Sequence, residues 1–247
     1  MSEPRAVETG TPELLCRVEE RVGVVVLNRP EARNALTLAM KEALLELLPR
    51  LEADGDVGCV LVTGAGSAFC AGGDTKTMAR DGRLPSPGER LELLHREHGI
   101  PLLLHRMAKP TIAALPGAAA GAGLGLSGDY GTSWFLTQLV GTARAREILF
   151  GADRLDAAAC ERIGLVNRVA PDEDLAREAL AWAVRIAAGP PVALRFMKDN
   201  LNRALAFDLE ACLGVEAERM VASAQTEDYL EAVRARAEKR EPVFRGR

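Results

Sequence analysis

Two glycine-rich stretches in the first half of the chain offer backbone amides, rather than side chains, as their chemical groups. The first follows an apolar, β-branched run, Cys59–Thr63, and ends in Ala71, Gly72 and Gly73. Glycine lets a ligand approach the backbone closely, and N–H groups at such a turn can hydrogen-bond an oxyanion or a phosphate. A tight strand-to-helix turn without a ligand is the alternative for this stretch taken alone.

The second stretch repeats the design of the first. An apolar run after Lys109 reaches Pro116-Gly117 and continues as a series of Ala and Gly residues. Two such strand ends can face each other across one pocket. Asp74, which closes the first stretch, is placed to cap or open the helix that follows it. The pair of stretches therefore predicts one pocket lined by backbone groups.

The chain resembles the enoyl-CoA hydratase/isomerase, or crotonase, superfamily in six short motifs. They occur in the family order over nearly the whole chain, which makes the resemblance specific although each motif alone is weak. The motifs are Leu27-Asn-Arg-Pro-Glu-Ala-Arg-Asn-Ala-Leu36, Ala68-Phe-Cys-Ala-Gly-Gly-Asp74, Lys109-Pro-Thr-Ile-Ala-Ala, Pro116-Gly-Ala-Ala-Ala-Gly-Ala-Gly123, Gly128-Asp-Tyr-Gly131 and Lys239-Arg-Glu-Pro-Val-Phe-Arg-Gly246. The resemblance implies an α/β fold: the crotonase-like (ClpP/crotonase) spiral of repeated β-β-α units with a helical C-terminal trimerisation region.

The resemblance also implies an activity. In this family two backbone N–H groups hold the carbonyl oxygen of an acyl-CoA thioester while its enolate forms, and by motif these donors are Gly73 and Ala122. Such preorganised donors act most strongly in a dry pocket. We expect an enoyl-CoA hydratase/isomerase-like enzyme, a lyase or isomerase. The alternatives are another enolate reaction on a CoA thioester and a non-catalytic acyl-CoA-binding protein.

Further residues are expected to bind the substrate. Arg29 and Arg33 can hold phosphates through charge-assisted hydrogen bonds, and in the family this loop lies by the adenine end of coenzyme A. Solvated surface arginines are the alternative. The other expected contacts are Ala71, Asp74, Thr75 and Lys76. Coenzyme A is part of the substrate, so neither a separate cofactor nor a metal is expected.

The proton-transfer groups depart from the family pattern. Family hydratases carry a glutamate four residues after the position of Gly121, where this chain has Gly125. Asp129 matches an aspartate that some relatives use as base or nucleophile, and an apolar acyl pocket beside it would raise its pKa toward that of a general base. The alternative is that Asp129 caps the helix after it.

A segment implied by the resemblance is missing between Leu126 and Ser127. Relatives have roughly two dozen residues there, including a core strand and the second hydratase glutamate, whereas this chain runs directly into the Gly128-Asp-Tyr-Gly131 motif. An open slot in a packed core costs several kcal/mol for each large side chain lost. The sequence therefore either omits part of the polypeptide or records a deletion, and the packing cost favours the omission.

Length, charge and cysteine content narrow the class of protein. The chain has 247 residues, a net charge of −4 and a pI near 5.6, so it can bury a sizeable core and lacks the basic face that nucleic acid requires. No apolar run reaches membrane-spanning length, and the start of the chain lacks the order of a signal peptide. Five cysteines without paired spacing indicate reduced thiols in the cytoplasm.

The elements that must position the first stretch follow from hydrophobic periodicity. Strands are predicted at Leu14–Glu20, Val22–Leu27 and Cys59–Thr63. A helix capped by Thr37 lies between the last two strands, which predicts a right-handed β-α-β unit with parallel strands. Pro49 should kink this helix or end it early.

Between the two stretches, the sequence predicts a loop or lid over residues 75–87 and then a helix interrupted at Gly99-Ile-Pro101. That helix carries His95, His98 and His105. No cysteine, carboxylate cluster or fourth ligand accompanies them, so solvated or lid-facing histidines are preferred to a metal site.

The last third of the chain is predicted to be helical, with helices split at Gly141 and capped by residues such as Asp208 and Thr226. Leu165–Ala170 is the exception, predicted as a strand or an extended arm. Helices without a sheet must pack on each other or on another subunit.

We therefore divide the chain into a crotonase-fold core over residues 1–187 and a helical oligomerisation region over residues 188–247. The resemblance implies a homotrimer or a hexamer built as a dimer of trimers.

Overall fold

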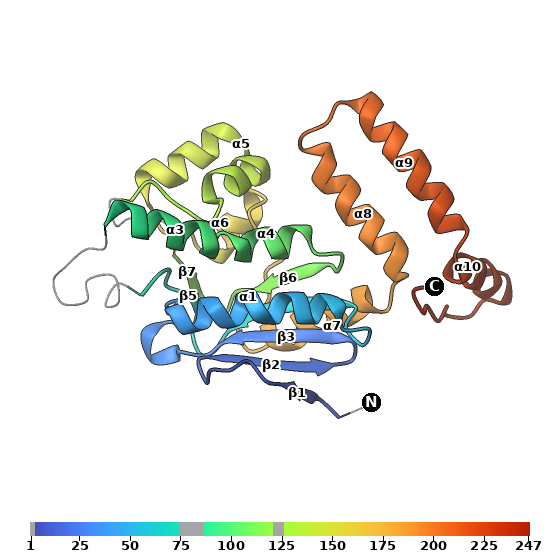
Figure 1. The fold of residues 1–247 in the computed structure, drawn as a ribbon, viewed down its shortest axis with the longest axis horizontal. Helices are drawn as coiled ribbons and strands as arrows, with labels where there is room; N and C mark the ends of the chain where they lie inside the picture. Colours follow the sequence, from blue (N-terminus) through green and yellow to red (C-terminus); the bar gives the residue numbers. More distant parts are fainter. Residues whose placement is uncertain (1–2, 75–85, 121–125) are drawn as a thin grey trace.

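A five-stranded sheet forms the base of the molecule in the computed structural model, which describes residues 3–74, 86–120 and 126–247 (Figure 1). Its order is β1-β2-β3-β4-β6. The first three strands are antiparallel, and β4 and β6 continue parallel to β3. The strands are β1 (Arg5–Val7), β2 (Leu14–Glu19), β3 (Val22–Leu27), β4 (Cys59–Gly64) and β6 (Thr111–Ala114).

Helices cover both faces of this sheet. On one face α1 (Leu38–Ala53) buries Leu44, Leu47, Leu48 and Leu51 in a core that also contains residues of β2 to β4. On the other face α7 (Leu175–Ala187) packs three small residues against β3, β4 and β6; these are Ala179, Ala183 and Ala187. β3 is buried along almost its whole length, because helices cover both faces of the sheet around it. This burial explains its continuous apolar sequence.

The predicted β-α-β unit is confirmed in β3, α1 and β4, with parallel strands. The Thr37 hydroxyl caps α1 by accepting a hydrogen bond from the Met40 N–H, 3.1 Å away. Of the two effects predicted for Pro49, a kink or an early end, the early end is wrong, because α1 continues to Ala53. The turn after the proline buries Leu51, which is 1% exposed, and this packing outweighs the lost backbone hydrogen bond.

Two helices, α3 (Pro87–Glu97) and α4 (Gly99–Arg106), lie above α1 (Figure 1). The break between them at His98 agrees with the predicted interruption. Most of the predicted lid, residues 75–85, lies outside the described residues. Beyond the second stretch α5 (Thr132–Gly151) contains a non-helical Gly141, as predicted, and α6 (Ala157–Arg162) follows. Of the two alternatives predicted for Leu165–Ala170, a strand or an extended arm, the strand is wrong: these residues form bends and irregular chain after a Gly164 turn with φ of 77°.

The C-terminal region consists of α8 (Pro191–Ala204), α9 (Leu209–Ala224) and α10 (Glu227–Glu238). Figure 1 shows α8 and α9 as a helical hairpin that projects from the sheet and its covering helices. The predicted caps Asp208 and Thr226 are confirmed, each accepting a hydrogen bond from a backbone N–H in the first turn. Lys198 joins α8 to the core by donating to the carbonyls of Leu104 and Lys109, both at 2.8 Å.

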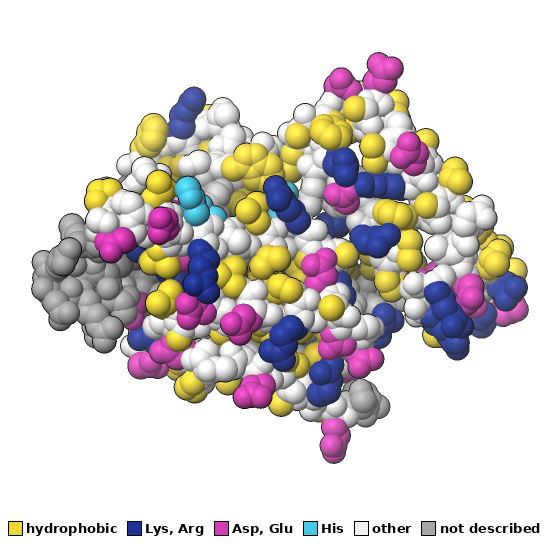
Figure 2. All heavy atoms as spheres, in the orientation of Figure 1, with side chains coloured by type: hydrophobic (Ala, Val, Ile, Leu, Met, Phe, Trp, Pro, Cys, Tyr) yellow, Lys and Arg dark blue, Asp and Glu magenta, His cyan; other side chains and the backbone are white. Residues whose placement is uncertain are grey.

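Apolar side chains are unevenly buried along the chain. Beyond residue 120, the fully buried apolar residues are mostly alanines: Leu136, Ala145, Ala179, Ala183, Ala187 and Ala235. Larger apolar residues there are exposed, and Figure 2 shows them in yellow over α8, α9 and α10. Among the described residues, no helix has the length and apolar character needed to cross a membrane.

Candidate active site

The two glycine-rich stretches lie side by side, as predicted. Residues Ala68–Cys70 form β5, which pairs in parallel with β7, Ala118–Ala119, as a small second sheet. The Ala120 N–H extends this pairing by donating to the Cys70 carbonyl, 2.9 Å away. Ala122, the predicted second donor, lies outside the described residues. The structure therefore brings the stretches together as far as Ala120.

Glycine is required at two close backbone contacts, one between the two stretches and one within the first stretch. A Cβ atom at Gly117 would stand 2.2 Å from the Ser67 carbonyl oxygen, and one at Gly64 would stand 2.4 Å from the Ala68 carbonyl oxygen. Both distances are far below any van der Waals contact, so neither position accepts a side chain without moving the backbone. These close backbone contacts fix the position of the second stretch relative to the first.

The loop before α1 binds the end of the first stretch through its backbone. The Ala71 N–H donates to the Arg33 carbonyl at 2.9 Å, and the Leu36 N–H donates to the Gly72 carbonyl at 2.8 Å. The Asp74 N–H completes the ladder by donating to the Leu36 carbonyl at 3.1 Å. These bonds hold the strand end in one conformation, which is the preorganisation that a backbone donor site requires.

One backbone N–H group of this segment, that of Gly73, takes no part in these hydrogen bonds. The Ala71, Gly72 and Asp74 N–H groups have acceptors, the Gly72 N–H lying 3.4 Å from the Cys70 sulfur. Gly73 is paired with Leu36 as an isolated parallel bridge, in which the flanking residues make the hydrogen bonds. Within the described part of the chain, the Gly73 N–H therefore has no acceptor. It is the group of this segment that can bind a ligand oxygen.

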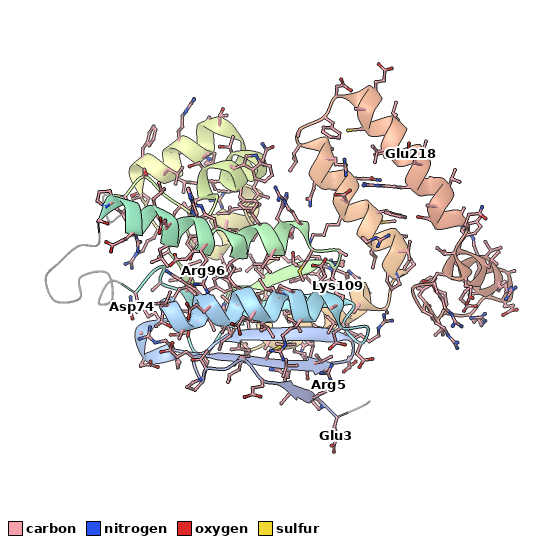
Figure 3. All side chains as sticks on the ribbon, viewed as in Figure 1. Glu3, Arg5, Asp74, Arg96, Lys109 and Glu218 are labelled. Carbon is pink, nitrogen blue, oxygen red and sulfur yellow. The ribbon has the colours of Figure 1, made fainter. Side chains whose placement is uncertain are left out.

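Arg29 and Asp74 connect the loop to the strand end. The Arg29 guanidinium lies 3.0 Å from the Asp74 carboxylate, donates to the Ala35 carbonyl and lies 3.3 Å from Glu13. Both partners of the central pair are largely buried, with side-chain exposures of 18% and 10%. Figure 3 labels Asp74 at the end of the sheet layer below α3. The pair thus fastens the predicted donor segment in place.

The other predicted binding residues are less enclosed. Ala71 and Arg33 are exposed, and the described contact between them is the backbone hydrogen bond. The Arg33 guanidinium is therefore turned to solvent, where an anionic ligand can reach it. Thr75 and Lys76 lie outside the described residues.

Asp129 lies in an exposed turn before α5. The helix is capped by Gly131 without a side-chain hydrogen bond, so the alternative that Asp129 caps it is wrong. The Asp129 backbone carbonyl accepts from both the N–H and the hydroxyl of Thr132, at 3.0 and 2.7 Å. The apolar surroundings expected for this carboxylate are not present, because its side chain faces solvent.

A buried polar cluster that was not predicted lies beside this turn. The Lys41 amino group is 2.9 Å from the Glu97 carboxylate, and the side chains are 8% and 3% exposed. The Tyr130 hydroxyl donates to the same carboxylate oxygen at 3.0 Å. Burial, and then the Glu97 charge, raise the pKa of Tyr130, so it stays a donor. The signal for the cluster was a lysine at core spacing, three residues before Leu44 on α1.

Of the three histidines predicted to be solvated or lid-facing, His95 is exposed, whereas His98 and His105 are partly buried. The His98 ring stands edge-on to Tyr130 with 5.8 Å between centroids, and its buried Nε2 atom has no hydrogen-bond partner in the described chain. His105 packs against Trp134 and Phe135 of α5, and burial lowers the pKa of its imidazole. The described residues hold no group of three or more potential metal ligands.

The sheet, its covering helices and the paired strand ends define a crotonase-fold protein, as two solved structures show. An enoyl-CoA hydratase from a Polaromonas species matches with a TM-score of 0.87 and 29% identity, covering 94% of this chain and 99% of that one. An enoyl-CoA hydratase from Bacillus anthracis matches with a TM-score of 0.87 and 26% identity over the whole of both chains. The predicted fold class is confirmed.

Sequence comparisons identify the family. Two family models, both described as enoyl-CoA hydratase/isomerase, match residues 22–130 and 124–247. The chain is 31% identical to the 1,2-epoxyphenylacetyl-CoA isomerase of Escherichia coli, covering 95% of this chain and 98% of that protein. It is also 31% identical to the short-chain-enoyl-CoA hydratase of Clostridium acetobutylicum, covering 90% and 93%. The chain belongs to the enoyl-CoA hydratase/isomerase family and is a hydratase/isomerase-like enzyme.

The comparisons also bear on the junction after Leu126. The first family model ends and the second begins within residues 124–130. The alignment with the Escherichia coli isomerase extends over 258 positions but includes only 95% of the 247 residues here. Roughly two dozen aligned positions therefore have no residue in this chain, which equals the length expected to be missing.

Proposed function

We propose that this enzyme binds an acyl-CoA thioester and stabilises its enolate with the backbone N–H groups of Gly73 and Ala122, while Asp129 moves the proton. The observation that carries the proposal is the Gly73 amide, which has no acceptor in the described chain although its neighbours do. Removing a proton from the carbon beside the thioester carbonyl puts charge on the carbonyl oxygen. An amide already held in place stabilises that charge without reorganisation.

An isomerisation is the reaction that we favour within this class. It needs one group that takes a proton from one carbon and returns it at another, and Asp129 is an exposed carboxylate whose side chain caps no helix. Hydration needs a second acid–base group, and this chain has Gly125 where hydratases of the family have a glutamate. The E. coli relative named an isomerase is in keeping with this choice.

We further propose that residues 188–247 form the contacts of a homotrimer or a dimer of trimers. Support comes from large apolar side chains on α8 and α9 that a single chain leaves in water, among them Leu201, Leu209 and Met220, which are 70%, 74% and 68% exposed. A cytoplasmic location is supported by five cysteines that form no disulfide.

Calorimetry with a panel of acyl-CoA thioesters, together with turnover assays on enoyl-CoA substrates, tests the proposed function. Binding should weaken as salt rises, because Arg33 and the nucleotide phosphates attract each other across solvent. Arg33→Ala should weaken binding and reduce this salt dependence. Arg5→Ala is the matched control, since Arg5 is also exposed but lies on β1 near the N-terminus, away from Asp74 (Figure 3).

Two results would contradict the proposal in different ways. If millimolar acyl-CoA produced neither heat in calorimetry nor a thermal shift, the proposal that the pocket binds acyl-CoA would be wrong. Tight binding without turnover of any enoyl-CoA would leave an acyl-CoA-binding protein.

A further inference from the structure

Three elements meet at the carboxylate of Glu97. It is the last residue of α3 and accepts from Lys41 of α1 and from Tyr130 of the turn before α5. The carboxylate is 2% exposed as a residue, and its second oxygen, Oε1, has no hydrogen bond within the described residues. A buried charge of this kind is held in place by its partners, since losing one of them leaves the others unpaired in the core. Tyr130 is thus tied to a rigid point in the core.

Tyr130 needs such a tie. Its φ is 54°, in the left-handed region that non-glycine residues seldom occupy, and bulky residues least of all. Gly128 and Gly131 on either side also have positive φ, at 91° and 78°. A turn with two glycines and one strained tyrosine keeps its shape only where surrounding contacts fix it. Here the contacts are the hydroxyl bond to Glu97 and the ring contact with His98.

Asp129 precedes Tyr130 in this turn. Its own side chain is exposed and caps no helix, so within the described residues the conformation of the turn sets where the carboxylate lies. The Tyr130 ring also packs against the apolar cluster that contains Met40 and Cys70, and Cys70 is the residue whose carbonyl joins the two glycine-rich stretches. The tyrosine therefore connects the turn that carries Asp129 with the strand end that carries Gly73.

We propose that Glu97 and Tyr130 are positioning residues: the hydrogen bond between them fixes the Gly128–Gly131 turn, and so the reach of Asp129 toward the substrate. This inference rests on the proposed function, in which Asp129 moves the proton. Neither residue needs to touch the substrate. Displacing a reacting group by about 1 Å can lower a rate by about a hundredfold, so a single hydrogen bond at the base of the turn is sufficient to control the reaction.

A double-mutant cycle between Tyr130→Phe and Asp129→Asn tests the inference, with kcat, KM and melting temperature measured for each variant. Phe keeps the ring and leaves the Lys41–Glu97 pair intact, so folding is retained. Tyr130→Phe should lower kcat about tenfold or more with little change in KM. In the Asp129→Asn background the same change should have no further effect, because the group that it positions is gone.

The outcomes separate the two hypotheses. Losses in kcat that multiply, or a Tyr130→Phe enzyme with full kcat, would overturn the positioning role while Asp129 keeps its function. An Asp129→Asn enzyme with full activity would overturn the proposed function, and the positioning role with it.

A second pair of variants keeps the Glu97 position testable without leaving a buried charge. Lys41→Met/Glu97→Gln removes both charges but retains an amide oxygen as acceptor for the Tyr130 hydroxyl, so kcat should stay near that of the parent enzyme. Lys41→Met/Glu97→Met removes the acceptor and should match Tyr130→Phe. Equal kcat in the two double variants would show that the acceptor is irrelevant and would overturn the inference.

Discussion

In the proposed function, Gly73 supplies the N–H group that the hydrogen bonds of its neighbours leave without an acceptor among the described residues. The N–H groups before and after it bind the Cys70 sulfur and the Leu36 carbonyl, so they cannot turn to a ligand without breaking the ladder. The half-buried Gly73 N–H keeps its hydrogen-bonding capacity for a ligand oxygen, which in the proposed function is the thioester carbonyl oxygen. The same hydrogen bonds that fix the segment therefore also select the donor.

Asp129→Asn tests the proton transfer itself. We expect turnover to fall on the order of a hundredfold or more, while acyl-CoA affinity stays nearly constant, because Asn keeps the size of the side chain but cannot accept a proton. The melting temperature should change little, since the side chain is exposed and caps no helix. Paired measurements of rate and melting temperature decide this. Equal losses of both would indicate a structural role for Asp129 instead.

At the scale of elements, periodicity predicted most of the sheet and helices. β2, β3 and β4 lie where alternating or continuous apolar residues indicated, and Thr37, Asp208 and Thr226 cap the helices that follow them. These features depend on residues close in sequence. The early end at Pro49 failed because tertiary packing of Leu51 outweighed a local rule.

The sequence predicted the backbone segments of the candidate site but not the buried side chains packed beside them. Bare strand ends are visible in sequence because glycine is their signal, and β5 and β7 do pair. The Lys41–Glu97–Tyr130 cluster joins residues far apart in the chain, and a lysine or glutamate on a helix is ordinarily solvated. Only the position of Lys41 on the apolar face of α1 gave a hint. Conversely, Asp129 was expected near apolar groups, and the structure leaves it in solvent.

The close packing of the chain beside the β5–β7 pair predicts the effect of a glycine substitution. Gly117→Ala should destabilise the protein by about 3 kcal/mol or more, since its Cβ would stand 2.2 Å from the Ser67 carbonyl oxygen and the backbone must move. Gly214→Ala on α9 is the control, because nothing lies within 4 Å of its Cβ and alanine favours helix by about 1 kcal/mol. Chemical denaturation measures both. A Gly117→Ala protein as stable as the parent would show that the two stretches are not packed this closely.

At the scale of the whole molecule, the core is concentrated in the first half of the chain. The large, fully buried side chains, such as Leu14, Leu47 and Val60, belong to β2, α1 and β4, whereas the second half buries mainly alanines. Helices α5 and α8 to α10 thus present more apolar surface than one chain covers. This exposure is the distribution that we expect if the chain assembles through these helices or lacks a core strand after Leu126, as proposed above.

We expect the expressed polypeptide to be heavier than the 26.4 kDa of this sequence, by roughly two dozen residues. The reason is the cost of leaving a strand-sized slot in a packed core. Intact mass spectrometry measures it directly. A mass of 26.4 kDa together with cooperative unfolding would show that the fold tolerates the deletion.

The reactivity of the cysteine thiols tests how well the core of the first half of the chain is buried. Burial raises the pKa of the Cys16 and Cys59 thiols to about 11, and it also raises the pKa of Cys70, so at pH 8 all three should stay protonated and unreactive. Cys160 and Cys212 are partly exposed. Iodoacetamide should therefore label at most two thiols in the native protein and five after denaturation. Rapid labelling of Cys59 in the native state would mean that β4 opens.

The order of the main sheet ends at β6, whose four residues, Thr111–Ala114, pair with β4 on one side. A short, neutral strand at the edge of a sheet carries unpaired backbone N–H and C=O groups. An extended peptide, including the same strand of another copy, can hydrogen-bond to them. Charged residues or proline, which block such pairing, are absent from Thr111–Ala114 itself. We therefore expect the β6 edge, as far as the described residues define it, to be a place where a further strand can be added to the sheet.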